Sequence, residues 1–122
     1  MQRVLVVEDD LDTAQAFAIM LREMGHDVEF AINGRAALDI AARFRPQTVF
    51  VDMLLPDFDG SDLARLLRLR AAPEKLFVVA VAGAAGDEVQ GRAVMAGCDA
   101  FLRKPVDWTV VERLFTVDFR SL

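Results

Sequence analysis

The stretch RVLVVEDD, residues 3–10, places a short apolar run directly before three acidic residues. Its length and β-branched content are typical of a strand that is buried on both faces of a parallel sheet. The pattern returns in TVFVD, residues 48–52, where a second apolar run ends in an aspartate. Together, the two stretches predict a parallel sheet that carries carboxylates at one edge.

Apolar runs alternate with helix-periodic segments along the rest of the chain. Further strands are predicted over 28–31, 76–81 and 100–103, with helices over 12–24, 35–44, 61–70 and 87–96 and a last helix capped by Asp107. This alternation predicts a single α/β domain over residues 1–122. We expect a flavodoxin-like, doubly wound fold with five helices and a five-stranded parallel sheet in the order 2-1-3-4-5.

Turn and cap signals mark the connections between these segments. Asn33-Gly34 is typical of a turn, and Ser61 is expected to cap the third helix because its hydroxyl can bond a free helix N–H group. Asp57 and Asp59 are expected as turn residues in the loop before that helix. Gly60 is expected to adopt a backbone conformation that is closed to other residues.

The composition argues against several classes of function. The 19 acidic and 14 basic residues give a formal net charge of −5, which argues against direct binding of nucleic acid because phosphate contacts need clustered Lys and Arg. The single cysteine, Cys98, excludes an internal disulfide and fits a reducing compartment. The sequence shows neither a signal-peptide pattern nor an apolar run of membrane-spanning length. We therefore expect a cytoplasmic protein that contacts neither nucleic acid nor membrane.

The predicted strand order brings distant acids together. Ligands of open α/β sheets bind at the carboxyl ends of the strands where the strand order reverses, here between the first and third strands. Glu8 and Asp9 follow the first strand and Asp52 ends the third. Carboxylates crowded in a crevice repel one another unless a cation is bound, and Mg²⁺ is the natural ion for oxygen ligands. His26 and Cys98 are expected at the opposite edge of the sheet and are not candidate ligands.

A lysine completes the predicted crevice. Lys104 follows the fifth strand, so its ammonium group is expected beside the same acids. A carboxylate nucleophile, a metal ion and a lysine are the parts that phosphoryl transfer requires, because positioning and charge neutralisation supply most of the catalysis.

Three motifs in order resemble those of response-regulator receiver domains, the CheY-like modules of two-component signalling. They are LVVEDD at 5–10, VFVDMLLPDFDG at 49–60 and FLRKPVD at 101–107. The resemblance covers essentially the whole chain. It implies that Asp52 is the phosphoacceptor and that Mg²⁺, or Mn²⁺, is held by Glu8, Asp9, Asp52 and the backbone carbonyl of Leu54, with Asp9 a more direct ligand than Glu8.

The same resemblance implies further roles. Lys104 would contact the phosphoryl group and precede a cis peptide bond to Pro105. The backbone of Gly83, through its amide, and the backbone of Leu54 are candidate contacts of the phosphoryl group. Phe101 would occupy the aromatic switch position, although it is equally a candidate for a plain core residue. The donor would be a histidine kinase or a histidine phosphotransfer protein, and the output a downstream protein partner or a phosphorylation-dependent homodimer. The domain would not be a classical enzyme, since it would at most catalyse its own phosphorylation and slow autodephosphorylation.

One position departs from the family pattern. Receiver domains usually carry Thr or Ser at the end of the fourth strand, where this chain has Ala82, and no Ser or Thr occurs from 76 to 86. A hydrogen bond to a charged group contributes about 1.5–3 kcal/mol, which matches a typical allosteric coupling of about 1–3 kcal/mol. We therefore predict a weakened or rewired output. Slow autodephosphorylation is predicted because Leu54 and Ala84, at the positions that tune hydrolysis in the family, cannot orient a water.

Two other functions compete with the phosphoacceptor. A pseudo-receiver would work only as a protein-interaction module, which Ala82 favours and the retained acids and lysine oppose. A metal-dependent phosphohydrolase would need a second acid two residues after the nucleophile, and that position is Leu54.

Overall fold

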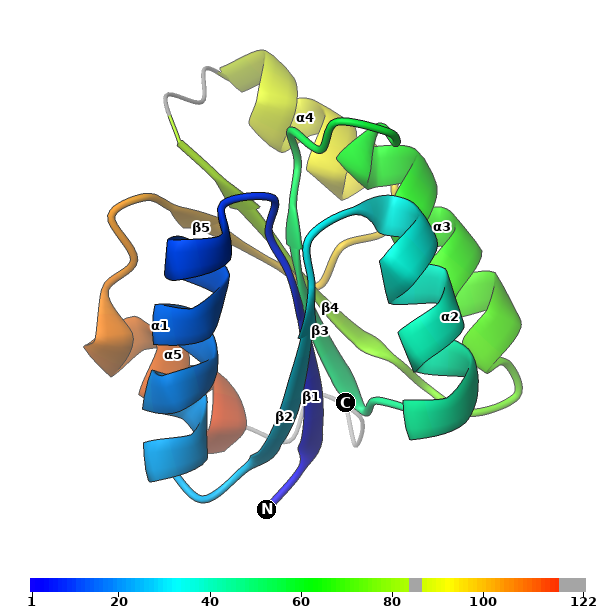
Figure 1. The fold of residues 1–122 in the computed structure, drawn as a ribbon. Helices are drawn as coiled ribbons and strands as arrows, with labels where there is room; N and C mark the ends of the chain where they lie inside the picture. Colours follow the sequence, from blue (N-terminus) through cyan, green and yellow to red (C-terminus); the bar gives the residue numbers. More distant parts are fainter. Residues whose placement is uncertain (84–86, 117–122) are drawn as a thin grey trace.

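The computed structural model describes residues 1–83 and 87–116. In this part of the chain, strands and helices alternate strictly from end to end (Figure 1). The strands are β1 (Arg3–Val7), β2 (Asp27–Ala31), β3 (Thr48–Asp52), β4 (Phe77–Ala82) and β5 (Ala100–Arg103). The helices are α1 (Leu11–Glu23), α2 (Gly34–Phe44), α3 (Gly60–Ala71), α4 (Asp87–Met95) and α5 (Trp108–Thr116).

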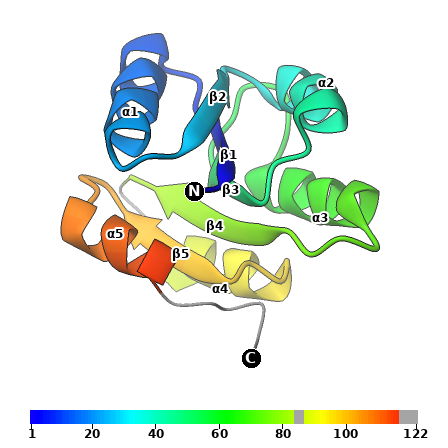
Figure 2. The same ribbon diagram turned by 90° about the horizontal axis from the view of Figure 1, so that it is seen from below.

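The five strands form one parallel sheet in the order β2-β1-β3-β4-β5. Helices α1 and α5 cover one face, and α2, α3 and α4 cover the other (Figures 1 and 2). The predicted fold class, strand order and number of helices are therefore confirmed, and each predicted strand or helix bound lies within one residue of the observed one.

The sheet separates two apolar cores because successive side chains of a strand point to opposite faces. Leu5 and Val7 of β1 pack toward α2 and α3. Val4 and Val6 of the same strand pack toward α1 and α5, together with Phe17. Burial on both faces explains why these strands have continuous apolar sequences rather than alternating ones.

Two helix starts differ from the sequence-based expectation. Asn33 is the N-cap of α2 rather than part of a turn, and its side-chain oxygen accepts a hydrogen bond from the Ala36 N–H at 2.8 Å. Asp59, and not Ser61, caps α3, because its carboxylate accepts hydrogen bonds from the N–H groups of Ser61 and Asp62. Ser61 itself is buried inside the first turn. At the last helix, the predicted cap is confirmed, since Asp107 accepts from the Thr109 N–H at 2.9 Å.

Gly60 is required for a different reason than expected. Its backbone does not lie in the left-handed region. A Cβ atom at this position would instead lie 2.5 Å from the Cα of Met53 and 2.8 Å from the carbonyl oxygen of Asp52. The start of α3 therefore passes directly over the end of β3, and only glycine permits that approach.

None of the helices within 1–83 and 87–116 combines the length and apolar character needed to cross a bilayer.

Candidate functional site

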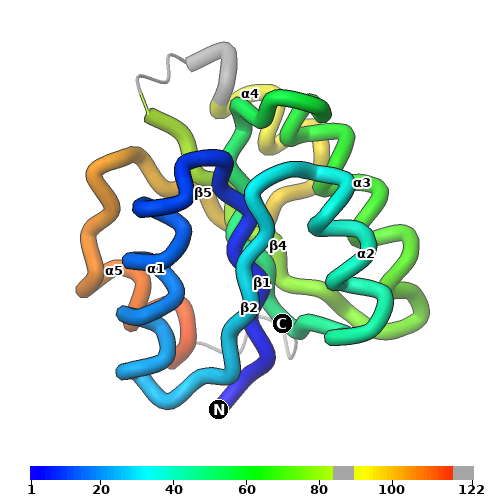
Figure 3. Tube along the Cα trace, in the orientation of Figure 1, coloured from blue at the N-terminus to red at the C-terminus, as the bar shows by residue number. Residues whose placement is uncertain are grey.

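Three acidic side chains meet at the carboxyl ends of β1 and β3. In the trace of Figure 3, the chain leaves β1, β3 and β4 at the same, upper end of the molecule. There, one carboxylate oxygen each from Glu8, Asp9 and Asp52 lies within 4.8 Å of the others. Glu8 and Asp52 are only 5% and 6% exposed, whereas Asp9 faces solvent. The structure thus brings together the acids that the strand order predicts to converge.

Lys104 reaches the same acids from the end of β5. Its Nζ lies 2.7 Å from Glu8 Oε2 and 3.3 Å from Asp52 Oδ2. The backbone of Lys104 is held by β4, because its N–H donates to the carbonyl of Ala82 at 2.8 Å. The peptide bond to Pro105 is cis, as predicted.

The second oxygen of Asp52 is held by the following loop. The Leu54 N–H donates to Asp52 Oδ1 at 2.9 Å. Leu54 in turn pairs with Asp59 in an isolated antiparallel bridge that closes the β3–α3 loop. The Leu54 side chain is 64% exposed. Asp52 is thus fixed from both sides, by Lys104 and by the loop backbone.

Burial and charge shape the ionisation of this cluster. Burial raises the pKa of Glu8, and the neighbouring Asp52 raises it further, while the contact with Lys104 acts in the opposite direction. Burial by itself would lower the pKa of Lys104, but the hydrogen bond to Glu8 and the charge of Asp52 outweigh it, so the net shift is upward. Lys104 therefore stays protonated at neutral pH, where one ammonium group faces several carboxylates. The crevice is suited to bind a further cation.

A cavity of about 260 Å³ opens beside these residues. Asp52, Glu8 and Lys104 form its polar end, and Phe17 and Trp108 form part of its apolar wall. Trp108 also packs edge-on against Phe17, with ring centroids 4.8 Å apart. No pattern in the sequence placed Trp108 near the acids. Its position makes the only tryptophan of the chain a natural fluorescent reporter of the site.

A larger cavity, of about 750 Å³, lies at the opposite ends of the strands, between the C-terminal ends of α2 and α3. Arg45 and Arg70 line it near those two helix ends, where cations offset the partial negative charge of the helix dipole. It is remote from the acidic cluster and is not part of the site.

The predicted switch positions lie on neighbouring strands. Ala82 is the last residue of β4 and is 1% exposed, and the partly buried Gly83 follows it. Phe101 of β5 is partly buried, and the guanidinium carbon of Arg103 lies 5.9 Å from its ring centroid. Ala84, predicted to influence hydrolysis, lies outside the described residues.

His26 and Cys98 lie away from the acids, as expected. His26 follows α1, and its Nδ1 accepts a hydrogen bond from the Gln2 N–H at 3.1 Å. Cys98 precedes β5, and burial raises the pKa of its thiol to about 11, so it is not a thiolate at neutral pH.

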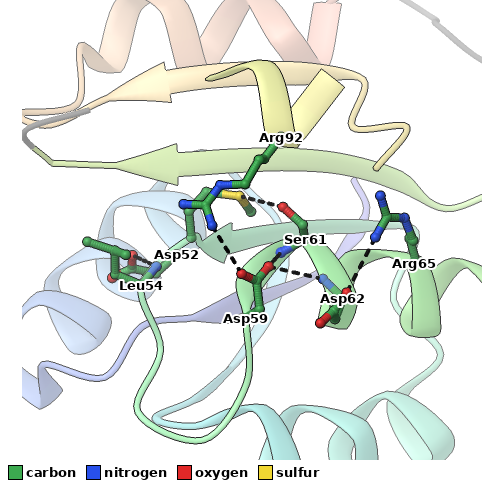
Figure 4. A network of polar contacts seen from close by, with 8 residues as sticks. Asp52, Leu54, Asp59, Ser61, Asp62, Arg65 and Arg92 are labelled. Carbon is green, nitrogen blue, oxygen red and sulfur yellow. Dashed lines mark hydrogen bonds and ion pairs between the residues drawn. The ribbon is translucent and has the colours of Figure 1, made fainter. Parts of the chain in front are cut away.

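Sequence reasoning missed a polar network that leads from the acidic cluster to α4. Asp59 Oδ2 forms an ion pair with Arg92 Nη1 of α4 at 3.4 Å, while Asp59 Oδ1 caps α3 (Figure 4). Aspartate is a common N-cap residue, so the position of Asp59 directly before α3 was a usable cap signal. Arg92 carried no signal, because nothing local to α4 specifies a partner on another element.

The similarity of the chain to known proteins is consistent with the site geometry. Residues 4–114 match the family model of the response regulator receiver domain. The chain belongs to this family, whose members are signalling modules of two-component systems rather than classical enzymes.

Individual relatives support the same assignment. Over 103 residues the chain is 35% identical to the response regulator MprA of Mycolicibacterium vanbaalenii; this covers 84% of the chain but only 44% of MprA. A CheY-like receiver domain protein of Methanospirillum hungatei superposes with a TM-score of 0.85 at 26% identity, covering 95% of this chain and 92% of that one. The chemotaxis protein CheY4 of Vibrio cholerae, at 24% identity, shares the fold with a TM-score of 0.87 over 97% of this chain and 99% of its own.

Proposed function

We propose that this domain is a phosphoacceptor switch in which Asp52 takes a phosphoryl group from a histidine kinase or a histidine phosphotransfer protein. The observation that carries the proposal is the meeting of three carboxylates within 4.8 Å, with the Lys104 ammonium 3.3 Å from Asp52. Family membership supports the donor class, because two-component systems join such receivers to histidine kinases.

The acidic cluster fits a hard divalent cation, Mg²⁺ or Mn²⁺. Glu8, Asp9 and Asp52 offer only oxygen ligands, and the backbone carbonyl of Leu54 is proposed as a fourth. When bound, such an ion neutralises the carboxylates and the oxygens of an incoming phosphoryl group. A single lysine does not balance the charge of the cluster, which is the physical reason to expect a cation there.

The proposed reaction is an attack by an Asp52 carboxylate oxygen on phosphorus. The new O–P bond forms as the bond between phosphorus and the donor's leaving group breaks, which gives an aspartyl phosphate. Lys104 Nζ already bonds Asp52 and lies within reach of the charge that moves onto the phosphoryl oxygens. We assign the N–H of Gly83, directly after β4, as a further donor to those oxygens.

The aspartyl phosphate is expected to be long-lived and its output atypical. Neither Leu54 nor Ala84 has a polar side-chain group to orient a hydrolytic water. Ala82 lacks the hydroxyl that would draw the loop after β4 toward the phosphoryl group, so Phe101 is expected to respond weakly. Output would be the binding of a downstream protein or the formation of a homodimer.

The test is the intact mass of the protein after incubation with acetyl phosphate, with and without Mg²⁺. We expect a metal-dependent gain of one phosphoryl group in the wild type and none in Asp52→Asn. The absence of any gain in the wild type would overturn the proposal.

A pseudo-receiver that only binds a partner protein is the second candidate, and the buried methyl group of Ala82 is the observation that favours it. It predicts no phosphorylation under any of these conditions.

A further inference from the structure

The Asp59 carboxylate joins three parts of the molecule. Its Oδ1 accepts hydrogen bonds from the first turn of α3, at 2.8 Å from the Ser61 N and 3.4 Å from the Asp62 N. Its Oδ2 faces Arg92 Nη1 of α4 at 3.4 Å. Its backbone pairs with Leu54, whose N–H bonds the phosphoacceptor Asp52 at 2.9 Å. Contacts therefore lead from Asp52 through Leu54 and Asp59 to α4 without passing through Ala82. Figure 4 shows the hydrogen bond between Leu54 and Asp52 and the ion pair between Asp59 and Arg92.

The geometry points to Arg92 as a positioning residue that restrains the phosphoacceptor loop in its unphosphorylated form. Through its ion pair with Asp59, Arg92 holds the Leu54–Asp59 segment in the conformation that directs the Leu54 N–H at Asp52. Phosphorylation releases this restraint and with it the attachment of α4. This inference rests on the proposed phosphoacceptor function and adds a route of coupling for a chain that lacks the switch hydroxyl.

The direction of the coupling between phosphorylation and the Asp59–Arg92 ion pair follows from the redistribution of negative charge at Asp52. In the structure, the Leu54 N–H bonds a charged carboxylate oxygen of Asp52. On phosphorylation, the negative charge moves from the carboxylate to the phosphoryl oxygens, and charge-assisted hydrogen bonds follow the charge. Displacement of Leu54 shifts its bridge partner Asp59, which loosens the ion pair with Arg92. The pair therefore stabilises the unphosphorylated form selectively.

Linkage then predicts the effect of removing the pair. A contact that favours the unmodified form weakens the binding of a phosphoryl group, and its loss strengthens binding by the same factor. The side chains of Arg92 and Asp59 are 48% and 40% exposed. Partly exposed pairs of this kind contribute up to about 1 kcal/mol, which corresponds to an increase in affinity of up to about fivefold.

The experiment measures the affinity of the protein for beryllofluoride, a phosphoryl mimic, in Mg²⁺ by titration of Trp108 fluorescence and by calorimetry. We expect Arg92→Gln to bind about two- to fivefold more tightly than the wild type, by the linkage above. Simple loss of a positive charge would weaken the binding of an anion. The direction of the change in affinity therefore distinguishes a positioning role of Arg92 from a general effect of its charge. Arg92→Lys, which keeps the charge, is expected to restore most of the wild-type affinity.

Arg65→Gln is the matched control. Arg65 pairs with Asp62 at 3.3 Å, but both residues belong to α3, so this pair joins no separate elements. The affinity of the Arg65→Gln variant for beryllofluoride should equal that of the wild type or lie slightly below it. Amide hydrogen exchange in α4 is measured on the same samples. Beryllofluoride should speed this exchange in the wild type and in Arg65→Gln. In Arg92→Gln, the exchange should already be fast without beryllofluoride.

Each outcome decides the inference. Unchanged or weaker binding in Arg92→Gln, or α4 exchange that does not respond to beryllofluoride in a wild type that binds it, would overturn the role of Arg92 and leave the phosphoacceptor intact. A wild type that neither binds beryllofluoride nor accepts a phosphoryl group would overturn the proposed function, and this inference with it.

Discussion

Ala82 stands at the end of β4, where receiver domains are expected to carry Thr or Ser. Its methyl group is 1% exposed at the end of β4, where a threonine hydroxyl could reach a phosphoryl group. We predict that Ala82→Thr enlarges the change in α4 hydrogen exchange on phosphorylation. The hydroxyl adds a hydrogen bond to a charged group worth about 1.5–3 kcal/mol, so beryllofluoride should bind about tenfold more tightly or better.

Ala82→Val is the control for this substitution, because valine matches threonine in shape and lacks the hydroxyl. Both variants place a β-branched side chain in a buried strand and share any cost of packing. If the two variants respond to phosphorylation alike, the missing hydroxyl is not what limits output.

Two glycines are predicted to respond to alanine in opposite directions. Gly60→Ala would place a Cβ 2.5 Å from the Cα of Met53, so urea unfolding should show a loss of at least about 2 kcal/mol. Around Gly91, inside α4, no atom of the described residues other than the helix's own backbone lies within 4 Å of an added Cβ. Gly91→Ala should therefore stabilise the protein by up to about 1 kcal/mol through helix propensity. A neutral Gly60→Ala would contradict the close approach of α3 to β3.

At the scale of single elements, sequence patterns predicted the strands and helices well but assigned some helix caps incorrectly. The continuous apolar runs of β1 and β3 allowed a clear strand assignment, because short runs of this kind are typical of strands buried on both faces of a parallel sheet. Asp59 was expected as a turn residue and Ser61 as the cap of α3, although both residue types can cap a helix. The close passage of Gly60 over β3 determines which residue is the cap, because it places Ser61 inside the helix and leaves Asp59 at its start. That contact is tertiary and leaves no local signal.

The loop between α1 and β2 is predicted to make stability sensitive to pH. Burial, with a further effect from the positive N-terminus, lowers the pKa of His26 from 6.5. Its ring packs on Phe115 of α5, with centroids 4.1 Å apart. Because the folded protein binds a proton here less readily than the unfolded chain, this stabilisation is complete above the unfolded pKa of 6.5 and is lost as pH falls through the lower folded value.

The measurement is urea unfolding at pH 8 and at pH 5.5, for the wild type and for His26→Gln. We expect the free energy of unfolding to fall more between these pH values in the wild type than in the variant. An equal fall in both proteins would assign the pH dependence to other groups.

At the scale of the whole molecule, the candidate site was predictable because topology determines it. Glu8 and Asp52 are separated by more than forty positions, yet parallel strands in the order 2-1-3-4-5 place both at one edge of the sheet. Trp108 and Arg92 were not predictable in the same way. Their positions near the site depend on side-chain packing between α1 and α5 and on the approach of α4 to the β3–α3 loop, which no pattern along the chain encodes.

The acidic cluster is predicted to make global stability depend on a divalent cation. Mg²⁺ that binds only the folded protein should raise the thermal midpoint, with about 1.4 kcal/mol gained at a tenfold excess over its Kd. Asp9→Asn should abolish most of this gain. Asp12→Asn should not, because Asp12 is an exposed residue of the first turn of α1 outside the cluster. Equal stabilisation of both variants would show that the cation binds elsewhere.

The central claim, that Asp52 itself carries the phosphoryl group, needs a measurement that locates the group. Three carboxylates lie within 4.8 Å of one another, and replacing Asp52 removes a proposed metal ligand as well as the proposed nucleophile. Borohydride reduction of the phosphorylated protein converts an aspartyl phosphate into homoserine, which peptide mass spectrometry then locates. We predict homoserine at position 52 alone, formed only after incubation with acetyl phosphate and Mg²⁺. Reduction at Asp9, or of Glu8 to its own alcohol, with position 52 unmodified, would contradict the account.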